Sequence, residues 1–201
     1  MKIILASASP RRKQLLKQMG LEFDVIPSNV EEELPDNLPY EEAVQELAFR
    51  KALHVASVIT DQCIIIGADT IVVKGEVIGK PRNRQEAREM LYKLQGQTHE
   101  VITGLALIDT ATGKTKKAFE KTIVKMTQLS MDEIERYVLT GEPMDKAGAY
   151  GIQGLAGIFI SSISGCYYNV VGLPIHRLWV MLKEFGVNPL FLNKNIIFFS
   201  S

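Results

Sequence analysis

The sequence lacks several features that would fix its class at once. Its 201 residues include only two cysteines, Cys63 and Cys166, which do not form a metal-binding or redox motif. This cysteine usage is typical of a reducing compartment, so we expect a cytoplasmic protein. A strand pattern begins at Lys2, and no signal peptide is expected. Apolar runs are too short to cross a membrane, so no membrane association is expected.

The sequence also lacks an excess of charge of either sign. Lysines and arginines number 23, aspartates and glutamates number 23, and the formal net charge is zero. Bulk electrostatic binding to nucleic acid or to a membrane is therefore not expected. Any anionic ligand must be met by a local group of cations. The length and the hydrophobic fraction of 46% indicate one domain, or two lobes that share a sheet.

Apolar strand patterns that alternate with helical patterns predict an α/β fold. Strands are expected at 3–6, 21–26, 64–73, 76–78, 96–109, 114–126 and 158–163, and helices at 10–19, 40–57, 84–94, 131–138 and 174–185. The two strands around the turn at 110–113 predict a long hairpin, which we expect to form a second lobe.

A carboxylate in the middle of a buried strand is the first candidate for chemistry. Asp69 interrupts the β-branched apolar run 64–73. Its burial costs free energy unless a cation, a metal or hydrogen-bond donors meet it. Asp69 therefore either belongs to a site or caps a neighbouring loop. Thr70 points to the opposite face of a regular strand, so the strand must bend or end if both residues serve one site.

Two arginines stand at the start of the first helix. Ser9 suits the N-cap, and Arg11 and Arg12 follow within the first turn. The helix dipole favours anions at this end, so two cations there are unexpected unless an anion binds with them. A bound phosphate explains the arrangement, and solvated arginines are the alternative.

Two lysines are further candidates for binding an anion. Lys51 lies on the apolar stripe of the helix 40–57, where it either reaches into a site or extends along the surface to water. Lys80 stands between Gly79 and Pro81, and the proline restricts it to an extended conformation. A lysine fixed in this way suits an anion better than a random surface charge does.

Three other features have both a structural and a functional interpretation. Glu32 lies in the acidic run 31–33, which is either solvated or provides a ligand for a metal or a water. For His99 we expect a hydrogen bond to a loop rather than a role as general base or metal ligand. The segment 145–154 contains three glycines, which let the backbone approach a ligand closely, and Gln153 can read a base edge through its amide.

Six motifs occur together and in order. They are Ser-Ala-Ser-Pro-Arg-Arg at 7–12, Gly-Ala-Asp-Thr at 67–70, Gly-Lys-Pro at 79–81, Gly-Gln-Thr-His-Glu-Val at 96–101, Asp-Lys-Ala-Gly-Ala-Tyr-Gly-Ile-Gln-Gly at 145–154 and Val-Val-Gly-Leu-Pro at 170–174. As a set they resemble the Maf family of nucleoside triphosphate pyrophosphatases, with no departure at the motif positions. The resemblance implies an elongated α/β fold, a mixed sheet with helices, in two lobes with a central cleft, similar to inosine triphosphate pyrophosphatases. It covers one domain, 1–189, and leaves a tail, 190–201, with an apolar end at 196–201.

The resemblance implies that a nucleoside triphosphate is hydrolysed to the monophosphate and pyrophosphate with a divalent metal, Mg²⁺ or Mn²⁺. By matched position, Asp69 is the catalytic proton acceptor, and Glu32 helps it to bind the metal or a water. The residues implied to hold the phosphates are Ser7, Arg12, Lys51 and Lys80. Arg11, Thr70 and Gln153 match the positions that separate substrate classes, and they look like the branch acting on dTTP and UTP rather than on 7-methyl-GTP.

Other functions stay open at this point. The family is also linked to arrest of septum formation and cell division, so a nucleotide-binding regulator with little catalysis is the main alternative. The presence of Asp69, Lys51 and Lys80 favours catalysis, because a pure binder has little use for a buried base. Nucleic-acid binding is disfavoured by the neutral charge balance. A homodimer is what the family suggests.

Overall fold

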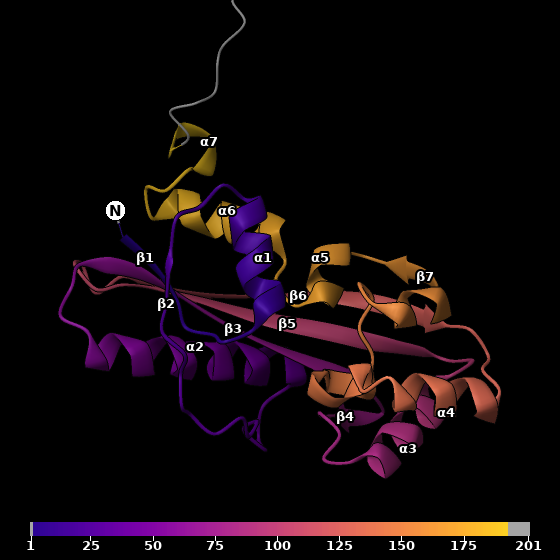
Figure 1. The fold of residues 1–201 in the computed structure, drawn as a ribbon. Coiled ribbons are helices and arrows are strands. Elements are labelled where there is room, and N and C mark those ends of the chain that lie inside the picture. Colours follow the sequence, from indigo (N-terminus) through magenta and orange to yellow (C-terminus); the bar gives the residue numbers. More distant parts are fainter. Residues whose placement is uncertain (1, 193–201) are drawn as a thin grey trace, which may run out of the picture.

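A computed structural model describes residues 2–192, which form a mixed seven-stranded sheet with helices on both faces (Figure 1). The strands are β1 (Lys2–Leu5), β2 (Asp24–Val25), β3 (Cys63–Lys74), β4 (Glu76–Ile78), β5 (Thr98–Asp109), β6 (Thr115–Met126) and β7 (Ile160–Ser164). The α-helices are α1 (Pro10–Gln18), α2 (Tyr40–Val58), α3 (Arg84–Leu94), α4 (Met131–Leu139), α5 (Tyr167–Val171), α6 (Ile175–Glu184) and α7 (Pro189–Leu192). Short 3₁₀ helices follow α4: η1 (Glu142–Asp145), η2 (Ala147–Ala149) and η3 (Leu155–Phe159). The predicted α/β class with a mixed sheet is confirmed.

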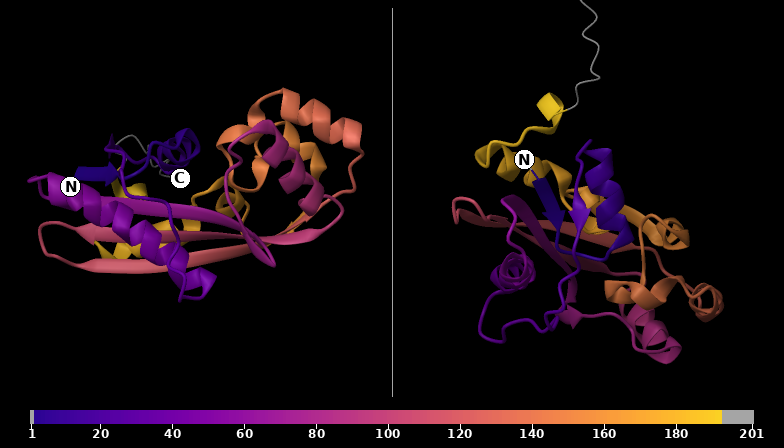
Figure 2. Two further views of the ribbon diagram at one scale, coloured as in Figure 1. Left: turned by 90° about the horizontal axis from the view of Figure 1, so that it is seen from below. Right: turned by 60° about the vertical axis from the view of Figure 1, so that its left-hand side comes forward.

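The sheet is organised around three long strands. Its order is β2-β1-β3-β5-β6-β7, and β4 pairs with the far end of β3. β1 is parallel to both of its neighbours, whereas the other pairs are antiparallel. Strands β3, β5 and β6 have 12 residues each and run along the length of the molecule, which gives it an elongated shape (Figure 2).

The prediction that the hairpin β5–β6 forms a second lobe is wrong. Residues 64–73 of β3 pair with residues 100–109 of β5, so the hairpin lies in the middle of the sheet. The two lobes instead share these long strands and differ in the helices that cover them. One lobe has α1 and α6 on one face and α2 on the other, and the second has α3 and α4 (Figure 1).

Alternation along β3 decides which side chains meet which helices. Ile64 and Ile66 pack with α1 and α6, whereas Ile65 packs with α2. By the same alternation, Asp69 lies on the α2 face and Thr70 on the α1 face. Both faces of this strand are covered, which explains its nearly continuous apolar sequence.

Two glycines let α2 lie close against the sheet. A Cβ atom added at Gly67 would lie 2.1 Å from the carbonyl oxygen of Ala48, and one added at Gly104 would lie 2.2 Å from that of Val44. Gly104 pairs with Asp69 in the register of β3 and β5. The helix that carries Lys51 is therefore set against the sheet beside Asp69.

The sheet has a gap along one edge of β3. The pairing of β1 ends with Leu5 opposite Ile66, and the pairing of β4 begins with Ile78 opposite Val72. Within the described residues, 67–71 of β3 have a partner strand only on the β5 side. Asp69 and Thr70 line one pocket although β3 neither bends nor ends there, so the condition we set for both to serve one site is wrong. β3 stays in register with β5 to Val73, and both faces become reachable at the gap.

Some local elements differ from the predictions. The strand expected at 21–26 is limited to the two residues of β2, which pair only with the short strand β1. Helix α5 was not predicted, and it is held to the sheet by the buried side chain of Asn169. The predicted capping of α1 is confirmed, since the Ser9 hydroxyl accepts a hydrogen bond from the backbone N–H of Arg12.

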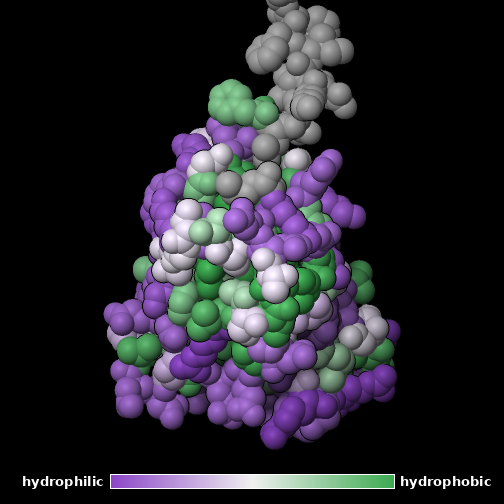
Figure 3. All heavy atoms as spheres, turned by 90° about the vertical axis from the view of Figure 1, so that its left-hand side faces the viewer, coloured by the Kyte–Doolittle hydropathy of each residue, from purple (hydrophilic) through white to green (hydrophobic). Residues whose placement is uncertain are grey.

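Seen from the end near β1, the surface is mostly hydrophilic, with apolar side chains gathered near the middle of the face (Figure 3). Among the helices of residues 2–192, none combines the length and the apolar character needed to cross a membrane. The domain limits predicted at 189 and 190 stay a prediction. The apolar end of the tail, 196–201, lies outside the described residues.

Candidate active site

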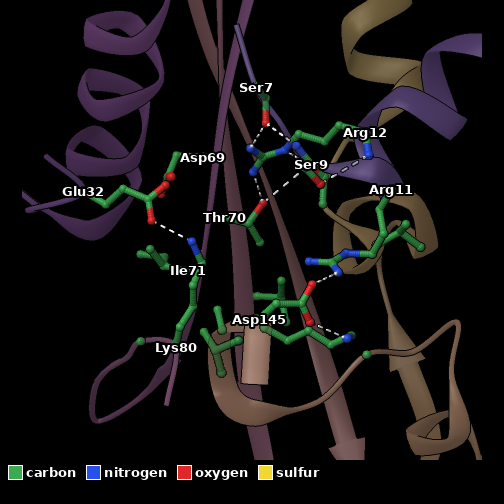
Figure 4. Close-up of a pocket in the computed structure, with 18 of the residues that line it drawn as sticks. Ser7, Ser9, Arg11, Arg12, Glu32, Asp69, Thr70, Ile71, Lys80 and Asp145 are labelled. Atoms are coloured by element: carbon green, nitrogen blue, oxygen red, sulfur yellow. Dashed lines mark hydrogen bonds and ion pairs between the residues drawn. The ribbon is translucent and has the colours of Figure 1, made fainter. Parts of the chain in front are cut away.

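A pocket of about 500 Å³ opens at the gap in the sheet (Figure 4). Most of its lining, apart from Lys51 of α2 and a few others, comes from five segments that are distant in the sequence. They are the turn after β1 (6–12), residues 69–72 of β3, the turn after β4 (78–80), the loop of η1 and η2 (145–151) and the end of α5 (170–172). Glu32 reaches the pocket from the loop that precedes α2.

The turn from β1 into α1 supplies one wall of the pocket. Arg12 is buried, and its guanidinium donates to the Ser7 hydroxyl at 3.1 Å, to the Thr70 hydroxyl at 3.1 Å and to the backbone oxygen of Gly172 at 2.9 Å. Burial lowers the pKa of Arg12, and the nearby carboxylates oppose this shift. A guanidinium has five N–H groups, and three are bonded here, so two have no partner among the described residues and can meet a ligand. Arg12 is therefore held rigidly with donors to spare.

A chain of alternating charges forms the opposite wall. The Lys51 ammonium donates to Asp69 at 2.7 Å and to Glu32 at 2.6 Å, and Lys80 donates to the other carboxylate oxygen of Glu32 at 2.7 Å. Lys51 and Asp69 are only 6% and 7% exposed, whereas Lys80 is exposed. The ion pair offsets the cost of burying the Asp69 carboxylate. Both lysines thus meet the acidic groups of the site.

Glu32 is strongly acidic in this setting. Partial burial raises the pKa of its carboxyl, but hydrogen bonds from Lys51 and Lys80 outweigh burial and lower the pKa to about 2. Glu32 is therefore ionised at any physiological pH. Its position between two lysines decides their orientation before a ligand enters.

The mouth of the pocket is bridged by a second ion pair. Arg11, from α1, donates to the carboxylate of Asp145, from η1, at 3.2 Å (Figure 4). Asp145 also accepts from Lys146 at 2.6 Å. Because Asp145 is largely exposed, this pair adds little stability, and a ligand can displace it at small cost.

The charges of the pocket favour an anion. Five cationic side chains line it, Arg11, Arg12, Lys51, Lys80 and Lys146, against the three carboxylates of Glu32, Asp69 and Asp145. A chain of zero net charge thus places a local excess of positive charge in one cleft. Such a cleft attracts a ligand with several negative charges.

Comparison with known proteins agrees with this geometry. The family model described as "Maf-like protein" matches residues 2–185. The chain belongs to the Maf family. A dTTP/UTP pyrophosphatase from Desulforamulus reducens is 58% identical and matches over 92% of this chain and 97% of its own. A dTTP/UTP pyrophosphatase from Acetivibrio thermocellus is 50% identical over 94% and 98%. Among solved structures, a HAM1 protein from Coxiella burnetii is 17% identical, covers 92% of this chain and 99% of its own, and has a TM-score of 0.49.

In this Maf-family chain, all but one of the residues predicted for the site line the pocket. Those that do are Ser7, Arg11, Arg12, Glu32, Lys51, Asp69, Thr70 and Lys80. Gln153 has an exposed side chain, and the residues of the segment 145–154 that line the pocket are Asp145, Lys146, Ala147, Tyr150 and Gly151. The role of Gln153 in specificity stays a prediction.

The donor set fits a metal that a substrate completes. No group of three His, Cys, Asp or Glu side chains suited to a metal occurs within residues 2–192. Lys51 donates to both Asp69 and Glu32 and so lies between the two carboxylates. Of the two Asp69 oxygens, only Oδ1 accepts a hydrogen bond from the described residues. Mg²⁺ is usually held by one or two carboxylates together with waters and substrate phosphates. Asp69 and Glu32 supply two carboxylates of this kind, and a metal held by them stays a prediction.

His99 has the structural role that the sequence indicates. Its Nε2 lies 2.6 Å from the Tyr150 hydroxyl, and its ring is buried outside the pocket lining. Burial and, to a lesser extent, the charge of Lys74 lower its pKa to about 4, so the ring is neutral at pH 7. The hydrogen bond to the glycine-rich loop is confirmed.

Sequence reasoning missed a polar group directly behind the pocket. Thr103 is fully buried, and its hydroxyl lies 2.9 Å from that of Thr70. The signal was present, because Thr103 is a hydroxyl in the apolar run 101–108. Only the pairing of β3 with β5 shows that this hydroxyl meets Thr70.

Proposed function

We propose that this chain hydrolyses dTTP and UTP to the nucleoside monophosphate and pyrophosphate. The observation that carries the proposal is a buried carboxylate, Asp69, held by Lys51 in a pocket with an excess of cations. Membership of the Maf family and relatives named dTTP/UTP pyrophosphatase at 58% and 50% identity support the substrate class.

The reaction requires water to attack the α-phosphorus while pyrophosphate leaves. Charge on the phosphate oxygens and on the leaving group must be neutralised by groups already in place. Arg12 offers two free N–H groups, and Lys80 is exposed at the pocket, where it can turn from Glu32 to a phosphate. We assign the phosphates to these two cations together with Lys51 and the Ser7 hydroxyl.

Asp69 is the proposed base. Lys51 holds its Oδ1, which fixes the orientation of the carboxylate and leaves Oδ2 to accept a proton from the attacking water. Glu32 orients Lys51 from the other side. A divalent metal, Mg²⁺ or Mn²⁺, held by Asp69 and Glu32 would supply further charge neutralisation when bound.

The test is product analysis with dTTP, UTP, CTP and GTP, with Mg²⁺ or Mn²⁺ and with a chelator. We expect metal-dependent release of pyrophosphate and the monophosphate from dTTP and UTP, and poor turnover of GTP. Asp69→Asn keeps the shape of the side chain and should lose at least about 100-fold in kcat. Orthophosphate as product would contradict the proposal, and so would full turnover by Asp69→Asn. Tight binding without turnover would favour the regulatory alternative.

Two further points stay predictions. A cytoplasmic location is expected from the cysteine usage, and a homodimer is what the family resemblance suggests.

A further inference from the structure

The Thr70 hydroxyl is surrounded by groups that restrict its proton. Oγ1 of Thr70 lies 3.1 Å from a guanidinium nitrogen of Arg12, 2.9 Å from Oγ1 of Thr103 and 3.5 Å from the backbone oxygen of Gly172. Thr70 also lines the pocket and points into it beside Arg12 (Figure 4). A hydroxyl has one proton to donate and two lone pairs to accept with.

The first neighbour leaves no choice, because a guanidinium only donates. Arg12 therefore occupies one lone pair of Thr70. The second neighbour, Thr103, is fully buried, and within residues 2–192 its hydroxyl has one other polar contact, the backbone oxygen of Asn169 at 3.2 Å. A carbonyl oxygen only accepts. When Thr103 donates to Asn169, it must accept the proton of Thr70.

The opposite arrangement has poorer geometry. If Thr103 donated to Thr70, the bond from Thr103 to the Asn169 oxygen at 3.2 Å would be lost. The Thr70 proton would then have the Gly172 oxygen at 3.5 Å as its acceptor. The Gly172 oxygen already accepts one bond of 2.9 Å from Arg12, and the Asn169 oxygen already accepts one of 2.9 Å from the N–H of Gly172. The two arrangements therefore differ in one hydrogen bond, of 3.2 Å to Asn169 in the first and of 3.5 Å to Gly172 in the second. A hydrogen bond of 3.5 Å is at the limit of useful length, so the first arrangement is favoured.

We propose that Thr103 is a positioning residue that fixes Thr70 as a hydrogen-bond acceptor toward the pocket, and that this selects a base with an N–H donor. With its proton held by Thr103 and one lone pair held by Arg12, Thr70 has only a lone pair left for a ligand. This inference rests on the proposed function and deepens it.

The chemistry of the ligand groups agrees with an acceptor at this place. Phosphate oxygens are acceptors, so they do not bind a second acceptor. Uracil and thymine both carry a proton on N3, whereas N3 of cytosine is a bare acceptor. Thr70 therefore accepts from N3–H of uracil or thymine and leaves cytosine unpaired, and an unpaired polar group in a site disfavours binding.

The experiment compares kcat/KM for UTP and CTP in the full chain and in two variants. Thr103→Val keeps the shape of the side chain and removes the acceptor for the Thr70 proton. Thr103→Ser keeps the hydroxyl and is the matched control. We expect the UTP-to-CTP ratio to fall about tenfold in Thr103→Val, mainly through faster CTP turnover, because Thr70 can then donate to N3 of cytosine. Thr103→Ser should keep the ratio of the unaltered chain.

A second background separates this effect from general damage. In Thr70→Val, the further change Thr103→Val should leave the ratio where Thr70→Val puts it, since the two residues act through one hydroxyl. An equal loss for UTP and CTP in Thr103→Val would overturn the inference, as would an unchanged ratio. A change confined to the ratio of UTP to 3′-deoxy-UTP would also overturn it, because the donor would then be a sugar hydroxyl. Failure of the proposed function is distinct, since the unaltered chain would then release no pyrophosphate.

Discussion

Lys51 is the residue on which the charged wall of the pocket depends. It is buried between two carboxylates and donates to both at 2.7 Å or less. Lys80 donates to the same glutamate but is exposed. A buried charge left without its partner is costly, whereas an exposed pair contributes little. The two lysines therefore differ in what they do for the fold, although both serve the pocket.

This difference can be measured by substitution. Lys51→Met leaves Asp69 buried and unpaired, so we expect the free energy of unfolding to fall by about 3–5 kcal/mol. Lys80→Met is the matched control and should cost less than about 1 kcal/mol. Chemical denaturation at pH 7 measures both. Equal losses in the two variants would show that burial does not separate these lysines.

The lowered pKa of His99 predicts how the stability of the fold depends on pH. Its pKa is lowered from 6.5 to about 4, chiefly by burial. Between these values the unfolded chain binds a proton that the folded chain does not, so stability is lost as the pH falls from 6.5 toward 4. The loss is roughly 3 kcal/mol, since one pKa unit corresponds to about 1.4 kcal/mol.

The measurement is denaturation of the unaltered chain and of His99→Gln at several values from pH 7 to pH 4. His99→Gln has no group to titrate at this place, so its stability should fall less steeply by the same roughly 3 kcal/mol. Parallel curves for the two proteins would contradict the assigned shift in pKa.

At the scale of elements, the contact between α2 and the sheet connects packing with the site. Gly67 and Gly104 let the helix backbone lie against β3 and β5. Lys51 follows Val44, the residue that meets Gly104, by two turns of α2. A displacement of α2 at Gly104 would therefore move the ammonium that holds Asp69.

Gly104→Ala tests this connection. The added Cβ would lie 2.2 Å from the carbonyl oxygen of Val44, so the helix must shift. We expect a loss of about 1–3 kcal/mol in the free energy of unfolding, together with a lower kcat. Gly79→Ala, where the added Cβ meets nothing within 4 Å, is the control for stability. Unchanged stability and kcat in Gly104→Ala would show that α2 is not set by this contact.

Helices and strands were predictable where they depend on residues that are neighbours in the sequence. The apolar run of β3 and the Ser9 cap of α1 both appear as expected, because strand composition and capping depend on neighbouring residues. The position of the hairpin β5–β6 was not predictable, since pairing between 64–73 and 100–109 joins residues far apart in the sequence. The meeting of Thr70 with Thr103 follows from that same register.

At the scale of the whole molecule, the pocket exists because the sheet is incomplete. Along β3, the pairing with β1 ends before the pairing with β4 begins. Asp69 and Thr70 therefore become accessible from opposite faces of one continuous strand. The motifs predicted most of the site residues, but spacing alone did not indicate this gap. Gln153 is the one predicted site residue whose side chain is exposed outside the pocket lining, and its role in specificity stays a prediction.

The central claim is that water attacks the α-phosphorus of a nucleoside triphosphate in this pocket. The most direct measurement is hydrolysis of dTTP in H₂¹⁸O, with mass spectrometry of both products. Attack at the α-phosphorus places the label in dTMP and leaves pyrophosphate unlabelled. Label in pyrophosphate would place the attack at the β-phosphorus, and label in orthophosphate would place it at the γ-phosphorus. Either result would contradict the account.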